Sequence, residues 1–516
     1  MLKNEDERLR LFKKIDKSLL TLIYLFLAVP IVMWLWFWFK RYISIPCILT
    51  IIYGFLAFRK NIKYKSLDGY ERIFNVKIIS ITCVLVLGLN IISGAGGLMF
   101  QNWDYHSRNA LLKDMVDHQW PVKYQFEAGS PEADFIGSEQ GLLSYYLAWF
   151  LPAAAIGKVS KSFNMASIFS FFWLLFGVLA VIYLIFRYFD RASLRILLVL
   201  LMITGVDFLA YFFDRLLIRG TFEFPNLINY LDTPLQMFSF HGFFTHWFWI
   251  FHQAIPIWIV MMLFMNNKDI RLFGLYISLA VAFAPLPTVG FGLILVRELI
   301  IKIKHSSFTQ ALKEALCLEN IVPILGIVPI LLLFRQNSST VGLMFSRTYI
   351  VPLREYLLSY IVYLIFEVFI FFFIMTRKNR SVVLFSIVLL TILPLFYLGG
   401  GADFGNRTTI PIMILLFIET INFYVDNRSR KYRIWFVNLI LILSLPTNLA
   451  EINRSLIYTH KRDSMTYRFE SDGYGTLANF EHNESKKFIK NFITKYSPDQ
   501  NFFTRYILKD INKRYE

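Results

Sequence analysis

Long apolar stretches recur along this 516-residue chain and constrain its fold more than any other feature. About thirteen runs of roughly 17 to 26 residues can be counted, and a helix of about 20 residues crosses the hydrocarbon layer of a bilayer. Because backbone polar groups find no water there, each run must be helical. The runs lie near residues 19–39, 42–58, 78–100, 141–157, 164–186, 194–213, 247–265, 272–297, 320–335, 357–376, 381–399, 410–426 and 434–450. The sequence predicts an all-α, polytopic bundle of about 11 to 13 crossings and excludes a soluble domain.

Composition and charge agree with this class. Hydrophobic residues make up 56% of the chain and charged residues 17%, where soluble domains have about 25% charged residues. The net charge of +17 comes largely from Lys and Arg in short loops, a pattern typical of cytoplasmic loops of membrane proteins rather than of nucleic-acid binding. Cys47, Cys83 and Cys317 are far apart, which argues against a zinc site or a disulfide framework.

The basic loops predict the topology. They alternate correctly when Met1 is cytoplasmic and Glu516 is outside, although the side that holds residues 187–246 stays undecided. We divide the chain into a cytoplasmic N-terminus with a transmembrane hairpin (1–77), a transmembrane core (78–450) and an extracytoplasmic C-terminal segment (451–516). That last segment is polar, and we expect it to be helical in part around 484–496.

Two of the apolar runs are interrupted. Gly141 to Gly157 is short and contains Pro152, and Leu272 to Val296 is broken at Ala284-Pro285-Leu286-Pro287. Helices that break at membrane depth usually line a cavity. Either run is therefore a candidate for a re-entrant segment, not a full crossing.

The loop from Gln101 to Gln140 carries the first candidate motif. Asp104 follows the third run by a few residues, with His106 and Arg108 behind it. An amphipathic stretch over Asn109–His118 predicts a short helix lying flat along the outer interface. A carboxylate fixed there suits a general base that takes a proton from an attacking hydroxyl. The alternative is that Asp104 caps the helix or pairs with Arg108.

The second candidate motif follows the glycine turn Gly399–Gly401. Asp403, Asn406 and Arg407 come next, on the same predicted outer face. Glycines let a backbone approach a ligand closely, and an arginine near amide N–H groups at a helix start binds phosphate well. A plain connecting turn with a snorkelling arginine is the alternative.

The third motif is a cluster of histidine and tryptophan. His246 and His252 are six residues apart, not the four that place two ligands on one helix face, so the metal signal is weak. An interfacial belt of Trp and His is the favoured interpretation. His252 and Gln253 nevertheless enter an apolar run, where polar side chains usually face a cavity.

Acidic residues of the outer loop form the last group. Glu127, Asp134 and Glu139 could position an acceptor sugar or hold a divalent ion. A solvated loop face explains them as well.

This pattern resembles the GT-C class of integral-membrane glycosyltransferases. Members have about 7 to 14 crossings and an outer first loop with an essential acid just past the membrane exit, which Asp104 in Trp103-Asp104-Tyr105-His106 matches. The likeness covers the architecture from about residue 78 to 450. The class often has a second acid near that loop, and Asp114, Asp117 and Glu127 all remain open for it.

The resemblance implies transfer of a sugar from a lipid-linked, polyprenyl-phosphate donor to a glycan, lipid or protein acceptor, outside a bacterial cytoplasmic membrane. Asp104 would be the general base with His106 beside it. The donor phosphate would be held by Arg407, Arg108, His252 and Gln253. We expect Asp104 and Arg407 to bracket one cavity, roughly 8 to 15 Å apart. Membrane lipids are the other partners, nucleic acid is excluded, no cofactor is assigned and a divalent metal ion is left open.

Other functions remain as alternatives. A polysaccharide polymerase or ligase would rely on outer-loop arginines such as Arg335, Arg347 and Arg354. A lipid or glycan transporter (flippase) would show repeated halves and deep ionisable residues, and the sequence shows no repeat and few such charges. A non-catalytic membrane scaffold is the last alternative.

Overall fold

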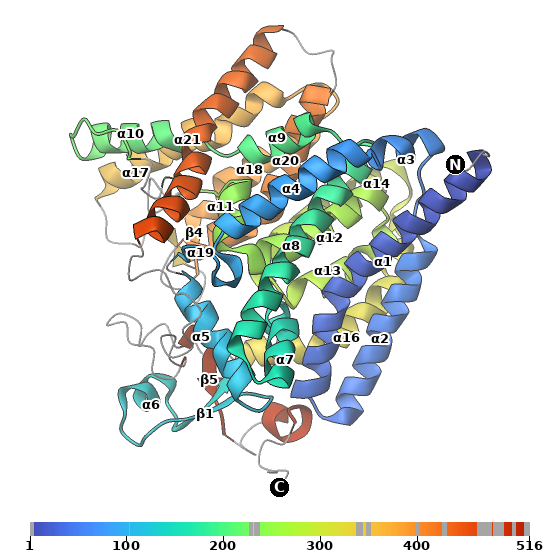
Figure 1. The fold of residues 1–516 in the computed structure, drawn as a ribbon, viewed down its shortest axis with the longest axis vertical. Helices are drawn as coiled ribbons and strands as arrows, with labels where there is room; N and C mark the ends of the chain where they lie inside the picture. The colour runs from blue at the N-terminus through green and yellow to red at the C-terminus, as the bar shows by residue number, and fades with distance from the viewer. Residues whose placement is uncertain are drawn as a thin grey trace.

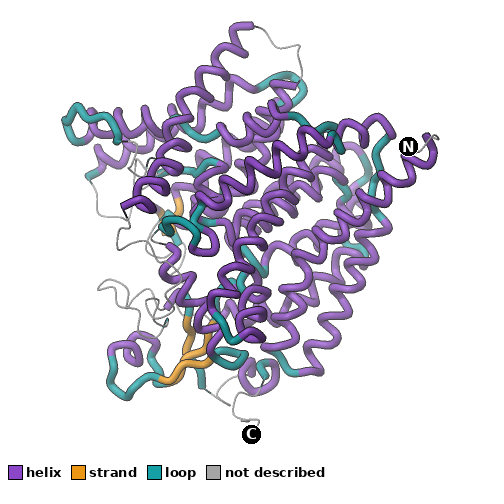
Figure 2. Tube along the Cα trace, viewed as in Figure 1, coloured by secondary structure: helices purple, strands orange, loops and turns teal. Residues whose placement is uncertain are grey.

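The computed structural model describes residues 5–102, 104–226, 231, 238–336, 344–346, 352–398, 402–425, 431–461, 477, 490–497 and 502–509. The structure is 78% helical. Within the described ranges, eight helical segments are long and apolar enough to cross a membrane, and they form one bundle (Figures 1 and 2). The predicted all-α polytopic bundle is confirmed.

The eight segments are α1 (Glu5–Trp38), α2 (Arg41–Lys60), α3 and α4 (Leu67–Ile73 and Val76–Ile92), α8 (Phe163–Tyr188), α9 and α10 (Leu194–Met202 and Asp207–Ile218), α16 (Leu318–Gln336), α17 with η5 and η6 (Leu353–Tyr363, Leu364–Val368 and Phe369–Ile374) and α21 (Lys431–Lys461). Between them come α11 (Phe243–Trp249), α12 (Phe251–Asn267), η3 (Ile270–Leu272), α13 (Phe273–Val281), α14 (Pro285–His305), α15 (Phe308–Ala315), α18 (Arg380–Ile392), η7 (Leu393–Leu395), α19 (Asp403–Thr408) and α20 (Ile410–Val425). A two-stranded sheet pairs β3 (Met344–Phe345) with β4 (Phe396–Tyr397).

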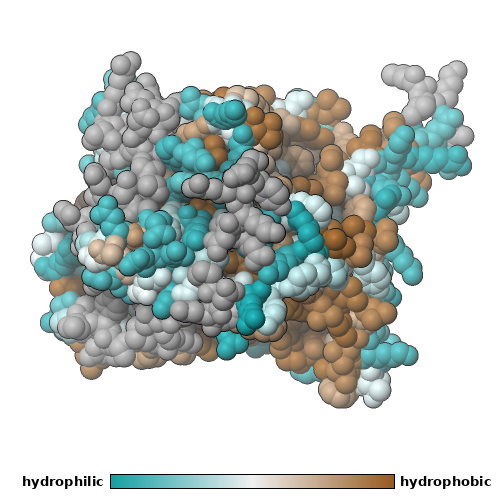
Figure 3. Space-filling model, turned by 90° about the horizontal axis from the view of Figure 1, so that it is seen from below, coloured by the Kyte–Doolittle hydropathy of each residue, from teal (hydrophilic) through white to brown (hydrophobic). Residues whose placement is uncertain are grey.

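The middle of the bundle is formed by α12 and α20, which contact each other. Nearly every residue of both helices is buried, as expected for helices that are apolar all round. The outer helices differ, because α2 and α4 leave large apolar side chains such as Leu49, Leu56 and Val84 exposed. Such side chains are suited to lipid contact, and Figure 3 shows a broad apolar area beside hydrophilic surface.

A small layer of mixed structure covers the end of the bundle opposite the N-terminus (Figure 1). It contains η1 (Ala95–Gly97), α5 (Asp104–Asp117), α6 (Pro131–Ile136), η2 (Leu147–Trp149), α7 (Leu151–Ser160), η10 (Phe503–Ile507) and the strands β1 (Lys123–Gln125), β2 (Gln140–Leu143) and β5 (Ile493–Lys495). The strands form an antiparallel sheet in the order β1-β2-β5. Of the stretch 484–496, which is expected to be helical in part, residues 493–495 pair as a strand, and residues 484–489 lie outside the described part of the chain.

The two interrupted runs have different outcomes. The run 141–157 is not one crossing, because its start pairs in β2 and the remainder forms η2 and part of α7. Sheet pairing therefore replaces the helical hydrogen bonds that a crossing needs. The break near residue 284 is confirmed, since α13 ends at Val281 and α14 begins at Pro285.

The helix predicted after Asp104 is present as α5 and ends at Asp117. Its position flat along the interface stays a prediction, and α5 is buried on most of its surface and packs against α7 and α8. Asp114, expected on the polar face, is buried and accepts hydrogen bonds from the Tyr124 hydroxyl (2.7 Å) and the Leu477 amide (3.0 Å). The C-terminal segment thus covers a face that the sequence pattern leaves to water.

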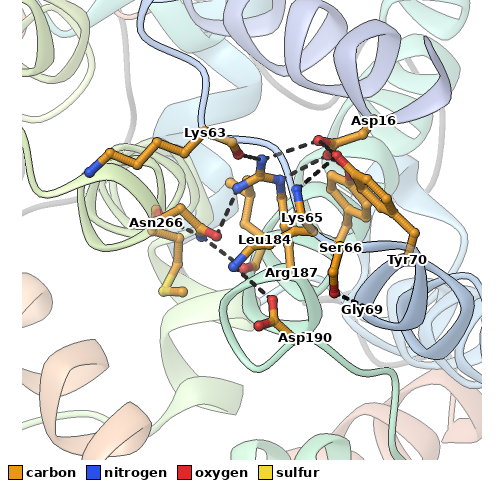
Figure 4. A network of polar contacts seen from close by, with 12 residues as sticks. Asp16, Lys63, Lys65, Ser66, Gly69, Tyr70, Leu184, Arg187, Asp190 and Asn266 are labelled. Atoms are coloured by element: carbon orange, nitrogen blue, oxygen red, sulfur yellow. Dashed lines mark hydrogen bonds and ion pairs between the residues drawn. The ribbon is translucent and has the colours of Figure 1, made fainter. Parts of the chain in front are cut away.

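At the other end of the bundle, a buried ion pair joins several helices (Figure 4). Arg187 of α8 donates to both carboxylate oxygens of Asp16 of α1, at 2.8 and 3.1 Å, and Tyr70 of α3 donates to the same carboxylate at 2.8 Å. The Asn266 side chain of α12 accepts from Arg187 at 3.1 Å. The expectation that few charged residues lie deep among the helices is therefore incomplete. These four side chains fix four helices relative to one another.

The described C-terminal residues lie at the far end of α1. The Lys509 amide donates to the Trp38 carbonyl (2.9 Å), and the Lys40 amide donates to the Ile507 carbonyl (3.0 Å). With 34 residues, α1 is about 51 Å long at 1.5 Å per residue. Glu5 and Lys509 therefore lie at opposite ends of the bundle.

Candidate functional site

Asp104 is the first residue of α5, and its carboxylate is held by the same helix. Its backbone N–H donates to the Asn102 side chain at 3.1 Å, and Arg108, one turn later, donates from Nη2 to Oδ2 at 2.6 Å. The Asp104 side chain is 32% exposed and that of Arg108 6%. The alternative that Asp104 pairs with Arg108 is thus realised, and the carboxylate still reaches the surface. His106 follows on α5 and is partly buried.

Arg108 also lines a pocket beside α5. The empty space in this pocket is about 430 Å³, part of it open to the surface. Its wall is mostly apolar and comes from η1, α5, η2, α8 and the start of α12, with the polar side chains of Gln101, Asn109, Ser167 and Ser170. Nη1 of Arg108 is buried and has no hydrogen-bond partner among the described residues. Leaving a charged donor unsatisfied is costly, so an anionic ligand that accepts from Nη1 would be stabilised here.

Arg407 lies near the end of α19, just before α20 begins. It pairs with Asp403 on the same helix at 3.3 Å, and its side chain is 16% exposed. Its Nη1 is also buried without a hydrogen-bond partner within the described part of the chain. The neighbouring Asn406 accepts from Ser239 at 3.4 Å. The turn at Gly399–Gly401 lies outside the described residues, and the motif that follows it is a short helix instead of an open turn.

The structure brings Arg407 and Asp104 into one electrostatic environment. Burial lowers the pKa of Arg407, while the carboxylates of Asp403 and Asp104 raise it, so that its pKa lies above the usual value. The phenols of Tyr145 and Tyr146 contribute in the same direction. Two motifs at distant points of the sequence therefore lie within electrostatic reach of each other. The expected separation of roughly 8 to 15 Å stays a prediction.

Tyr145 and Tyr146 are site residues that the sequence reasoning missed. They follow β2 directly and are partly buried, with ring centroids 4.3 Å apart. Burial raises the pKa of the Tyr145 phenol, and the nearby charges of Arg108, Arg407 and Asp104 also act on it. The sequence feature that could have identified these two residues was a pair of tyrosines beside an interrupted apolar run.

His252 and Gln253 open the central helix α12 and face the same region. Both are buried, and their side chains approach each other at 3.3 Å, from Gln253 Nε2 to His252 Nε2. The His252 ring lies 6.4 Å from that of Tyr145 and within electrostatic reach of Arg108 and Arg407. The expectation of an interfacial Trp and His belt is wrong here, because His246 and Trp247 are fully buried as well.

The acidic candidates of the outer loop separate into different environments. Glu127, Asp134 and Glu139 are exposed on the hairpin and α6, which fits a solvated loop face. For the second acid, Asp114 is occupied by the structural hydrogen bonds described above, and Asp117 is a surface group paired with Lys113 at 2.6 Å. Within the described ranges, no group of three or more His, Cys, Asp or Glu side chains could hold a metal ion.

The structure also shows where residues expected for the alternative functions lie. Arg335 and Arg354 are exposed on different helices, α16 and α17, while Arg347 lies outside the described residues.

Two carboxylates, Asp207 and Glu367, are fully buried. Both lie against Gly205 at the break between α9 and α10, where a Cβ atom would be 2.7 Å from Asp207 Oδ1 and 2.9 Å from Glu367 Cγ.

The fold and its apolar helices define an integral, multi-pass membrane protein of the all-α class. No known protein family, no curated protein and no solved structure matches this chain. The functional proposal for this protein therefore depends on the chemistry of the candidate site.

Proposed function

We propose that the protein is a membrane glycosyltransferase that moves a sugar from a polyprenyl-phosphate donor to an acceptor on the outer face of the membrane. The observation that supports this most is that Asp104 and Arg108 of α5, which are bonded at 2.6 Å, lie within electrostatic reach of Arg407 of α19 and of Tyr145. A carboxylate that accepts a proton and arginines that bind an anion are the two elements such a transfer needs.

Each element has a distinct task. Asp104 reaches the surface, so it can take the proton of an acceptor hydroxyl as that oxygen attacks the sugar. The anionic phosphate leaves toward Arg407, whose buried Nη1 has no partner among the described residues, with Arg108 and His252 beside it. Buried charge near the leaving oxygen is worth more than the same charge in water.

A transporter for the same class of lipid-linked sugar is the second candidate, and one observation favours it. Asp207 and Glu367 are buried side by side at a helix break. Burying two carboxylates is costly unless a cation or a proton accompanies them, and such groups mark ion pathways in transporters. A transporter moves the donor across the membrane without breaking its glycosidic bond, so product analysis separates the two functions.

The test is the substitution Asp104→Asn, which keeps the shape of the side chain and removes its basicity. With purified protein in liposomes and a polyprenyl-phosphate sugar donor, we expect transfer to fall by roughly 10²- to 10⁴-fold, the usual contribution of a general base. Donor binding should change little, because Arg407 remains.

Asp117→Asn is the matched control, since Asp117 lies on the same helix in an exposed pair with Lys113. It should leave transfer unchanged. Normal sugar transfer by the Asp104→Asn protein, inserted in the membrane at the wild-type level, would remove the proposed base. Movement of intact donor by a protein that forms no new glycosidic bond would favour the transporter.

A further inference from the structure

Tyr145 lies beside His252 of the candidate site, with ring centroids 6.4 Å apart, and a distant part of the chain supports it. Its ring is stacked on Tyr146 on one side, and the ring of Phe492 lies 4.3 Å away, tilted by 33°. Phe492 belongs to the C-terminal segment and is 2% exposed. The polar cluster of Asp104, Arg108 and Arg407 is therefore connected to the tail through two aromatic rings.

The position of Phe492 is fixed by the sheet. Its carbonyl accepts from the Ser144 amide at 2.8 Å, and the Tyr496 amide donates to the Gln140 carbonyl at 2.9 Å, so these two bonds bracket β5 on β2. Gly141 lets the strands approach, because a Cβ atom there would be 2.5 Å from Ile493 Cγ2. Ser144, which makes this hydrogen bond to Phe492, directly precedes Tyr145 in the chain. Removing the strand would release the residues that carry the tyrosine pair.

The tail is anchored to the rest of the protein as well as to the sheet. Thr494 donates to the carbonyl of Gln336 at the end of α16, and Leu508 forms a β-bridge with Phe39 beyond α1. Leu477 donates to Asp114 of α5, the helix that begins with Asp104. The described parts of the tail thus contact α5, the sheet and two membrane helices.

We propose that the C-terminal strand is part of the site, that Phe492 is a positioning residue, and that the Tyr145 ring which it supports contacts the sugar of the bound donor. This rests on the proposed function. Contacts place Tyr145 beside the proposed donor position: its ring lies 6.4 Å from that of His252, and the guanidinium of Arg108, which is bonded to Asp104, lies 5.3 Å from the ring of the neighbouring Phe251. The electron-rich face of an aromatic ring attracts the polarised C–H groups of a sugar. Phe492 touches no substrate and acts by holding Tyr145 in place.

The first experiment does not depend on the reaction. Amide hydrogen exchange of residues 140–146 is compared in the wild-type protein, in Phe492→Ala and in Phe492→Leu, which keeps most of the side-chain volume. We expect faster exchange at Ser144–Tyr146 in both variants, more strongly in Phe492→Ala, because local opening requires less free energy when packing is lost. Phe502→Ala is the control, since Phe502 is in the same tail but 70% exposed, and its exchange should match the wild type. Wild-type exchange in Phe492→Ala would overturn the positioning role whatever reaction the protein catalyses.

The second experiment is a double-mutant cycle on sugar transfer with Phe492→Ala, Tyr145→Ala and the double variant. Misplacing Tyr145 should raise the donor KM and lower kcat/KM by roughly 10- to 100-fold, with kcat less affected. If Phe492 acts through Tyr145, the double variant should be no worse than Tyr145→Ala alone, and Phe492→Tyr should restore transfer. Additive losses would overturn the link between the two residues. Absence of transfer in the wild-type protein would instead count against the proposed function, and the exchange result would still decide the role of Phe492.

Discussion

Two arginines carry the positive charge of the candidate site, and each is held by a carboxylate on its own helix. Arg108 pairs with Asp104 and Arg407 pairs with Asp403. In both, the second terminal nitrogen, Nη1, is buried without a partner among the described residues. A planar guanidinium can pair with one carboxylate and still present a donor to a ligand, which a lysine ammonium does with less directional control. The identity of these residues therefore matters as well as their charge.

Replacement of Arg407 by lysine tests this at the residue scale. We expect Arg407→Lys to weaken donor use by roughly tenfold and Arg407→Ala by roughly 100-fold, because a charge-assisted hydrogen bond contributes about 1.5 to 3 kcal/mol. The measurement is kcat/KM for the polyprenyl-phosphate sugar. Arg271→Lys is the control, since Arg271 makes a comparable ion pair with Asp269 but is 51% exposed and lies outside the site. Unchanged donor use in both Arg407 variants would refute the phosphate-binding role.

At the scale of secondary-structure elements, the position of α19 depends on close contact with α14. Gly290 of α14 faces the carbonyl of Thr408, the last residue of α19, and a Cβ atom there would lie 1.9 Å from that oxygen. Gly405 of α19 is similarly close to Pro394, at 2.9 Å from its Cα. Backbone is harder to displace than the end of a side chain. These two glycines therefore set where Arg407 lies relative to α14 and Pro394.

Gly290→Ala should push α19 away from α14. We expect a loss of stability of about 1 to 3 kcal/mol from overpacking, visible as a lower unfolding temperature in detergent, together with weaker sugar transfer because Arg407 moves. Gly292→Ala is the matched control on the same helix, since a Cβ atom at Gly292 meets no heavy atom within 4 Å. It should be as stable as the wild type or more stable by up to about 1 kcal/mol. Equal behaviour of the two variants would show that the contact does not position α19.

At the scale of the whole molecule, the site and the described C-terminal segment lie at one end and the start of α1 at the other (Figure 1). The buried Asp16–Arg187 group fixes the helices near the N-terminus, whereas the sheet and the tail organise the end with the site. The distribution of basic loops predicts that the N-terminal end is cytoplasmic. On this prediction the candidate site faces outward.

Reporter fusions test this topology. A reporter that is active only outside the cytoplasm should be active when fused after Glu516 and inactive when fused to Met1, because α1 is long enough to separate the two ends of the bundle. A fusion in the loop between α2 and α3, next to the basic segment at residues 59–65, should behave like the fusion to Met1. A cytoplasmic location for the C-terminal reporter would place the proposed site on the wrong face for an outward transfer.

The sequence alone was sufficient for the class of fold and for several local features. Apolar runs of bilayer length can only be helical, because the backbone has no other partner for its hydrogen bonds in lipid. The helix after Asp104 and the break before Pro285 also depend on local sequence, and both are present. The same local reasoning singled out Asp104, Arg108, His252 and Arg407, and the structure gathers these four residues in one region.

Other features depend on contacts between residues far apart in the sequence, which local sequence patterns do not predict. The run 141–157 reads as a crossing, yet its start pairs with β5 from the opposite end of the chain. The burial of α5 and of Asp114, and the packing of the Phe492 ring against Tyr145, likewise depend on residues far away in the sequence. An apolar side chain is expected to leave water. Its apolarity does not determine whether protein or lipid covers it, since both provide an apolar environment. That choice is made by the packing of the whole chain, and it is what brings a C-terminal phenylalanine to the proposed sugar site.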